Sequence, residues 1–209
     1  MASVTKSPQT MQFYARVLSY ISDTADLRDN LVLQGGGALC FFYGSCRMTS
    51  DLDFVSPRLN RRLTDQLTKG FKSATGVAFQ LDEGPDYIVV TYRQESQVMG
   101  VVEITEQTAN DCIRINNVNM LSGTELLTDK ITTLHNRLEK RNLVVETDIL
   151  YILYLLQKGY FATPKQIREK ARQYGYRAWD RQINNRLKEK LSTRKDIDEQ
   201  TLDQILCIA

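Results

Sequence analysis

The spacing of hydrophobic residues changes once along this chain, near residue 120. Before that point the apolar residues form short runs rich in β-branched and aromatic side chains, and the runs are separated by glycine, proline and acidic residues. Such runs are typical of strands, and such separators are typical of hairpin turns. The predicted strands are Leu31–Gln34, Asp51–Val55, Val77–Leu81, Tyr87–Arg93, Gln97–Thr105 and Ile113–Val118.

Apolar residues three and four positions apart predict helices on both sides of this region and within it. The predicted helices of the first part are Gln12–Ile21, a short one at Ala38–Tyr43, and Arg58–Phe71; Ser22–Asn30 is predicted as a polar exit. After residue 120 all the apolar spacing is helical, with helices opening near Ser122, Glu146, Thr163 and Asp180. The pattern predicts an α+β fold, with a mixed, antiparallel-rich sheet in residues 1–120 and a helical unit in residues 121–209.

The most specific chemical pattern lies at residues 35–54. Three glycines, Gly35, Gly36 and Gly37, follow a predicted strand, and glycine lets backbone amides approach phosphate oxygens closely. Asp51 and Asp53 follow at a spacing of two, which places both carboxylates on one face of a strand. Two acids on one face repel each other unless a cation lies between them. A solvated strand end is the alternative, but together the two features favour a divalent metal beside a phosphate.

Glu103 is a third candidate ligand because it interrupts the apolar strand around Val102 and Ile104. A carboxylate is costly to bury in such a strand unless it is paired or bound to a metal. If its strand lies beside that of Asp53, three carboxylates converge, and oxygen ligands of this kind suit Mg²⁺. The alternative is that Glu103 faces solvent.

Cationic residues recur on the first helix of the second part. Lys130, Arg137 and Arg141 are spaced so that they return to nearly the same helix face. Such a stripe is suited to a triphosphate or an RNA backbone, and a solvated face is the alternative. Asp148 opens the next helix, where an acid is favoured by the helix dipole alone.

The charge distribution is more informative than the net charge of +2, since residues 158–194 contain eleven Lys or Arg and three Asp or Glu. This block is a candidate surface for a polyanion. Aromatic and arginine residues interleave within it, which indicates either a surface for single-stranded RNA or a helical core with a basic rim. These residues are Tyr174, Tyr176, Trp179, Arg172, Arg177 and Arg181.

Several functional classes are excluded. Four cysteines without a CxxC spacing and a single histidine, His135, do not make a zinc cluster or a catalytic triad. The chain has no GxxxxGK[ST] sequence, which excludes a P-loop. The longest apolar run, Ile149–Leu156, is too short to span a bilayer. We expect a soluble cytoplasmic protein that does not act at a membrane.

Two segments resemble motifs of one known family. The first reads Leu33-Gln-Gly-Gly-Gly-Ala-Leu39, then Gly44, then Arg47-Met-Thr-Ser-Asp-Leu-Asp-Phe54; the second contains Asp129-Lys130, Arg137, Arg141 and Asp148. Together they are similar to the AbiEii/AbiGii-type (MenT-like) nucleotidyltransferase toxins of the DNA polymerase β-like superfamily. The similarity extends over about Leu31–Leu156. Gly37 and Asn142 depart from the residues usual in the family.

The resemblance implies a role for each motif residue. Asp51, Asp53 and Glu103 are expected to bind metal, Mg²⁺ or Mn²⁺, and Lys130 to contact the triphosphate. Asp148 is expected as a late acidic residue of the catalytic site. The nucleotide-binding residues are expected to be Gly35, Gly36, Gly37, Arg47, Ser50, Lys130 and Arg137.

The resemblance also implies a reaction. We expect metal-dependent transfer of NMP from an NTP to an RNA acceptor, tRNA above all, by a toxin of a toxin–antitoxin or phage-defence system with a cognate antitoxin protein. Three alternatives stay open. They are transfer to a protein hydroxyl at the same site, a member that binds a nucleotide or partner without turnover, and an RNA-binding module.

Overall fold

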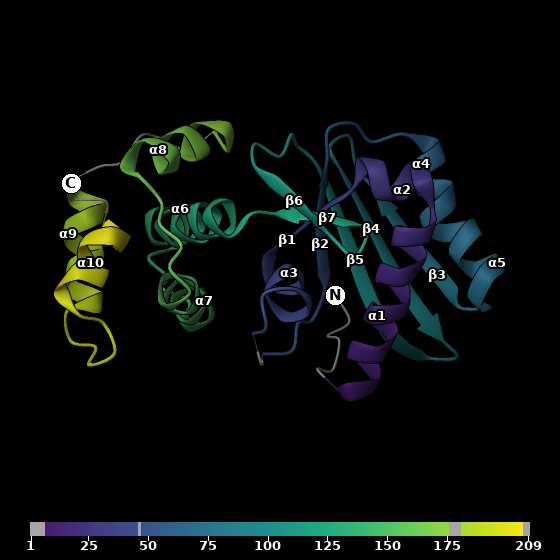
Figure 1. Ribbon diagram of the computed structural model, residues 1–209, viewed down its shortest axis with the longest axis horizontal. Helices are drawn as coiled ribbons and strands as arrows, with labels where there is room; N and C mark the ends of the chain where they lie inside the picture. Colours follow the sequence, from purple (N-terminus) through teal and green to yellow (C-terminus); the bar gives the residue numbers. More distant parts are fainter. Residues whose placement is uncertain (1–6, 46, 176–180, 207–209) are drawn as a thin grey trace. The chain divides into compact units, whose positions relative to one another are not determined.

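The chain divides into two compact units, Met1–Ser122 and Gly123–Ala209. The computed structural model describes residues 7–45, 47–175 and 181–206. The first unit is a sheet with helices, and the second is helical (Figure 1). The predicted α+β class is therefore confirmed.

The first unit is built on a seven-stranded sheet in the order β3-β4-β5-β2-β1-β7-β6. β1 pairs with β7 in parallel and β2 with β5 in parallel, while the other four pairings are antiparallel. The sheet is thus mixed and antiparallel-rich, as predicted. The strands are β1 (Val32–Gln34), β2 (Leu52–Ser56), β3 (Ala78–Glu83), β4 (Tyr87–Gln94), β5 (Gln97–Glu106), β6 (Cys112–Ile115) and β7 (Val118–Leu121).

One face of this sheet is buried and the other is half-exposed. Along β4 the side chains of Ile88, Val90 and Tyr92 are buried, while those between them are partly exposed. This alternation is the pattern of a sheet with a single covered face. Phe13 of α1 (Pro8–Asp23) and Phe71 of α5 (Phe71–Thr75) contact the Tyr92 ring, with centroids 5.4 and 4.9 Å apart. The helices that carry these rings cover the buried face.

The segment after β2 is one helical stretch of three parts. α4 (Arg61–Asp65) leads into a π-helical turn, η1 (Gln66–Gly70), and then into α5. The side chain of Asn60 accepts the Leu63 amide at 3.0 Å and caps the start. The predicted helix Arg58–Phe71 therefore begins at Arg61.

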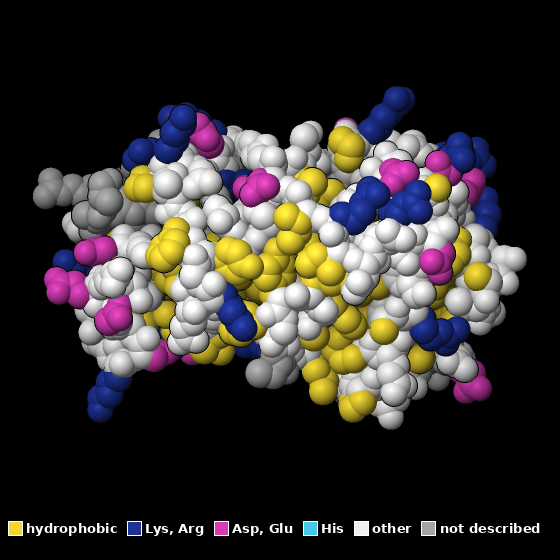
Figure 2. Space-filling model, in the orientation of Figure 1, with side chains coloured by type: hydrophobic (Ala, Val, Ile, Leu, Met, Phe, Trp, Pro, Cys, Tyr) yellow, Lys and Arg dark blue, Asp and Glu magenta, His cyan; other side chains and the backbone are white. Residues whose placement is uncertain are grey.

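The second unit consists of helices that contact α6 (Gly123–Arg141) or one another. They are α7 (Glu146–Gln157), α8 (Pro164–Gln173), α9 (Arg181–Leu191) and α10 (Glu199–Leu206). Thr163 and Gln166 form a capping box that starts α8. One face of α8 buries Ile167 and Ala171, and its exposed face is rich in Lys and Arg (Figure 2).

Several of the polar groups buried inside this helical unit are paired. The Lys170 ammonium donates to the Glu125 carboxylate at 2.7 Å, and both side chains are buried. The Tyr174 hydroxyl donates to the Asp129 carboxylate. Breaking such a pair is costly because one charge would stay buried alone. These contacts fix α8 against α6.

The chain reverses at Asn116 and Asn117, inside the predicted strand Ile113–Val118. Both residues have positive φ, 50° and 60°. Two successive left-handed residues are typical of a type I′ hairpin turn, and asparagine tolerates that conformation. The single strand predicted here is therefore wrong: the segment forms the hairpin β6–β7.

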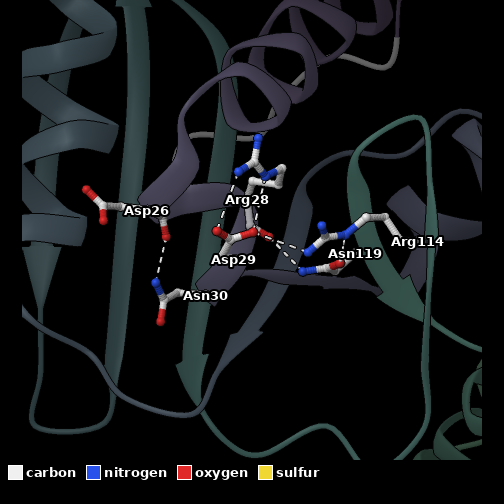
Figure 3. Close-up of polar contacts among 6 residues, drawn as sticks. All are labelled: Asp26, Arg28, Asp29, Asn30, Arg114 and Asn119. Carbon is white, nitrogen blue, oxygen red and sulfur yellow. Dashed lines mark hydrogen bonds and ion pairs between the residues drawn. The ribbon is translucent and has the colours of Figure 1, made fainter.

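A short helix, α2 (Ala25–Asn30), occupies the predicted polar exit Ser22–Asn30. The sequence shows no helical spacing of apolar residues here, because Leu27 is the one buried side chain of this helix. Polar contacts connect it to the neighbouring hairpin (Figure 3). Arg114 donates to Asp29 at 3.2 Å, and Asn119 donates to the Arg28 carbonyl at 2.6 Å.

Among the described helices, none is both long enough and apolar enough to cross a membrane.

The buried His135 makes the stability of the second unit sensitive to acid. Its Nε2 donates to the Ile205 carbonyl at 2.9 Å, and burial lowers the pKa of the imidazole from 6.5 to about 4. The unfolded chain therefore binds a proton more readily than the folded one. The contribution of neutral His135 to the free energy of unfolding is fully present above pH 6.5 and is lost as the pH falls from 6.5 to about 4.

We predict that His135→Gln removes this part of the pH dependence, because glutamine can donate the same hydrogen bond without titrating. The free energy of unfolding, measured in urea at about pH 7 and about pH 4.5, should fall by about 2 kcal/mol more for the wild type than for the variant. Equal losses in the two proteins would contradict the assignment.

Candidate functional site

The glycine turn lies directly against Asp53. Gly35 has φ +64°, and a Cβ at this position would lie 2.5 Å from Asp53 Oδ2. Only glycine fits both the backbone angle and this space. Gly35 also begins α3 (Gly35–Phe41), so the helix predicted at Ala38–Tyr43 starts three residues earlier and includes the glycine run.

The other two glycines form the first turn of α3. A Cβ on Gly37 would lie 2.9 Å from Leu52 Cδ2, so this glycine allows α3 to pack closely against β2. Gln34 stands at the N-cap and makes no side-chain hydrogen bond to that turn. Gly36, between Gly35 and Gly37, is half-buried.

Asp53 and Glu103 are side by side on adjacent strands. β2 and β5 pair in parallel with Asp53 opposite Glu103, and β1 places Gln34 opposite Asp53 on the other side. Residues directly opposite each other point to the same face of a sheet. All three side chains are half-exposed, so this row lies on the uncovered face. The prediction for Glu103 required its strand to lie beside that of Asp53, and β5 does lie beside β2.

Asp51 lies in a bend one residue before β2 and is held by two hydroxyls. Ser50 Oγ donates to Asp51 Oδ2 at 3.2 Å, and Thr49 Oγ1 donates to the Asp51 carbonyl at 2.9 Å. Ser50, predicted to bind nucleotide, thus contacts a carboxylate of the candidate metal site. Arg47, three residues earlier, is half-buried, and its amide donates to Ser45 Oγ at 3.3 Å.

The carboxylates influence one another electrostatically. Burial, together with the charge of Asp51, raises the pKa of Glu103 above its usual value. Burial raises the pKa of the Tyr14 hydroxyl as well, and the negative charges of Asp51, Asp53 and Glu103 add to the effect. Three carboxylates therefore act on one hydroxyl, which places them in one neighbourhood.

The donors in this neighbourhood are hard carboxylate oxygens, which are the ligands preferred by Mg²⁺ and Mn²⁺. Within the described residues, no three His, Cys, Asp or Glu side chains are close enough together to hold a metal ion as they stand. Repulsion between uncompensated carboxylates favours such a separation. Metal binding by Asp51, Asp53 and Glu103 stays a prediction.

Sequence reasoning missed two residues of this neighbourhood. Tyr14 is fully buried on α1, where its aromatic ring matched the predicted apolar face of a helix. Gln34 carries a buried Oε1 without a hydrogen-bond partner, beside the Asp53 carboxylate across the β1–β2 pair. A buried acceptor without a partner is unusual in a folded protein. No local pattern marks either residue, because only strand pairing and helix packing bring them to the site.

The remaining predicted residues lie in the second unit. Lys130 is half-buried, and its Nζ lies 5.9 Å from the centroid of the Tyr151 ring. Arg137 donates to the buried carboxylate of Asp148, which joins α6 to α7. A structural role thus accounts for this pair, and its part in nucleotide binding or catalysis stays a prediction. Tyr176, Arg177 and Trp179, predicted to bind RNA, lie outside the described residues.

Solved structures with a comparable course of the chain include two from Helicobacter pylori. A putative nucleotidyltransferase from H. pylori is 15% identical, with 95% of this chain and 92% of that chain covered and a TM-score of 0.47. JHP933 from Helicobacter pylori is 17% identical, with 96% and 90% covered and a TM-score of 0.45. The Megavirus polyadenylate synthase is 9% identical, with 98% and 39% covered and a TM-score of 0.47.

Sequence comparison gives a more direct assignment. No curated protein matches the chain. The family model described as "Nucleotidyl transferase AbiEii toxin, Type IV TA system" matches residues 16–204, which is most of the chain. This range extends over most of each unit and includes every predicted site residue. The chain therefore belongs to the AbiEii nucleotidyl transferase toxin family of type IV toxin–antitoxin systems.

Proposed function

We propose that this protein transfers a nucleoside monophosphate from an NTP to a hydroxyl of RNA, with tRNA as the preferred acceptor, in a reaction that requires a divalent metal. The observation that carries the proposal is the row formed by Asp53 and Glu103 in register on β2 and β5, with Asp51 at the start of β2. Membership of a nucleotidyltransferase toxin family supports the same reaction class.

Asp51, Asp53 and Glu103 are the residues that would hold Mg²⁺ or Mn²⁺. The fit rests on the donor chemistry and on the raised pKa of Glu103, which reflects its burial and the adjacent charge of Asp51. A cation placed among these groups would offset the repulsion between their negative charges. When bound, the metal supplies charge neutralisation for the triphosphate and activation of the acceptor hydroxyl.

Residues of the chain itself would orient the substrate. The first turn of α3 presents the amides of Gly35, Gly36 and Gly37, and Gly35 brings the backbone close to Asp53. Amides at such a turn suit phosphate oxygens. Ser50 holds the Asp51 carboxylate, and Lys130 is proposed to contact the triphosphate.

The acceptor surface is proposed to include a basic stripe on α8, formed by Lys165, Arg168 and Arg172. All three side chains are exposed, and their spacing places them on one side of the helix, away from the face that buries Ile167 and Ala171. Lys and Arg that neutralise phosphates dominate the affinity of proteins for nucleic acids. A cognate antitoxin belongs to the proposal, because the family is described as part of a toxin–antitoxin system.

We predict that Asp53→Asn lowers nucleotidyl transfer by about a hundredfold or more, the size typical of losing one group that stabilises a transition state. The protein is incubated with each labelled NTP, Mg²⁺ and total RNA, and label is measured separately on RNA and on protein. Asp65→Asn, which alters an acid on α4, serves as the matched control. Label on RNA that persists in the Asp53 variant would contradict the proposed site, and Asp53-dependent label on protein alone would favour a protein hydroxyl as acceptor.

Neutralising the basic stripe should weaken RNA binding in a manner that depends on salt. For Lys165, Arg168 and Arg172 all changed to Gln, we predict that the slope of log K against log salt becomes shallower by about 2. A variant with Arg16, Arg58 and Lys72 changed to Gln loses the same charge from exposed sites of the first unit. Equal changes in both variants would rule out a specific role for α8.

A further inference from the structure

The buried hydroxyl of Tyr14 lies between the two strands that carry the acidic residues. It donates to the Ser50 carbonyl at 2.5 Å and accepts the Val101 amide at 3.1 Å. Ser50 immediately precedes Asp51, and Val101 lies two residues before Glu103 on β5. One side chain from α1 therefore contacts the backbone next to two of the three carboxylates.

The hydroxyl occupies the position of a missing strand-to-strand hydrogen bond. The parallel pairing of β2 and β5 begins at Leu52 opposite Val102. In a parallel ladder the next bond toward the start of the strands would join the Val101 amide to the Ser50 carbonyl. Tyr14 is inserted between these two groups, so two hydrogen bonds through its oxygen replace one direct bond. The chain at Asp51 is thereby held away from β5.

The sheet is shaped to admit this side chain. A Cβ on Gly100 would lie 2.6 Å from the Tyr14 ring and 2.9 Å from the Phe13 ring, so glycine at this position makes room for α1. The pairing of β4 and β5 also shifts register between Tyr92 and Arg93, opposite Gly100 and Val98. Such bulges end or redirect strand pairing and are frequent next to active sites.

From these contacts we infer that Tyr14 is a positioning residue for the metal site: its hydroxyl sets the separation between the Asp51 segment and β5, and with it the spacing of Asp51 and Glu103. The inference rests on the proposed function, because it concerns the same carboxylates. Groups that orient metal ligands without touching the metal change metal affinity strongly when they are removed.

Tyr14→Phe tests the inference, since it removes the hydroxyl and keeps the ring that fills the space beside Gly100. Tyr92→Phe is the matched control. Tyr92 is also fully buried in the first unit, and its hydroxyl donates to the Leu67 carbonyl at 2.6 Å, away from the acidic row. Thermal unfolding of both variants reports the stability cost of losing one buried hydroxyl.

The probe is Mn²⁺ alone, titrated into the full-length protein with free Mn²⁺ measured by electron paramagnetic resonance. We expect Tyr14→Phe to weaken Mn²⁺ binding by about tenfold or more and Tyr92→Phe to leave it unchanged. In the transfer assay, Tyr14→Phe should raise the Mn²⁺ concentration for half-maximal rate, while the rate at saturating Mn²⁺ stays near that of the wild type.

Two results would overturn the inference alone: Mn²⁺ binding by Tyr14→Phe equal to that of the wild type, or equal weakening in both tyrosine variants. A wild-type protein that binds no Mn²⁺, or that binds it equally well after Asp53→Asn, would instead overturn the proposed metal site together with the inference.

Discussion

Mutual repulsion of carboxylates is the constraint on which the candidate site of the first unit depends. Asp51, Asp53 and Glu103 are gathered near the start of β2, where burial and the charge of Asp51 raise the pKa of Glu103. Strand register holds Asp53 beside Glu103, and hydroxyls of Thr49 and Ser50 hold Asp51. A fold that keeps such charges together without a cation stabilises an arrangement that a divalent metal would relieve.

The surroundings of these carboxylates are closely packed. A side chain at position 35 would collide with Asp53, and one at position 100 would collide with the rings of α1. Tyr14 bridges the backbone just before β2 and the middle of β5. In the second unit the buried charges are paired instead, as in Lys170 with Glu125 and Arg137 with Asp148. A buried pair of opposite charges needs no external ion.

Sequence patterns were sufficient for the α+β class and for most elements, because the apolar period differs between strands and helices. They were insufficient where few residues decide the structure. α2 buries a single side chain, Leu27, and the β6–β7 turn depends on the left-handed conformation of two asparagines. Predictions of this kind need tertiary contacts or turn geometry that a periodic pattern does not contain.

The candidate site shows the same division. The spacing of Asp51 and Asp53 and the unusual Glu103 are visible in the sequence, and the strand order then places Glu103 beside Asp53. Tyr14 and Gln34 were not predictable, because only helix packing brings Tyr14 to the site and only the β1–β2 pairing brings Gln34 beside Asp53. Asp148 looked like a site residue or a helix cap, and its ion pair with Arg137 emerges only from the contact of α6 with α7.

The location of a bound metal is the most direct test of the central claim, that Asp51, Asp53 and Glu103 form a metal site for nucleotide transfer. Crystals of the protein soaked in Mn²⁺ can be examined by anomalous diffraction. We predict a peak at the carboxylates of Asp51 and Asp53, on the Glu103 side of β2. No peak there, or a peak only at acidic residues outside this site, would contradict the claim.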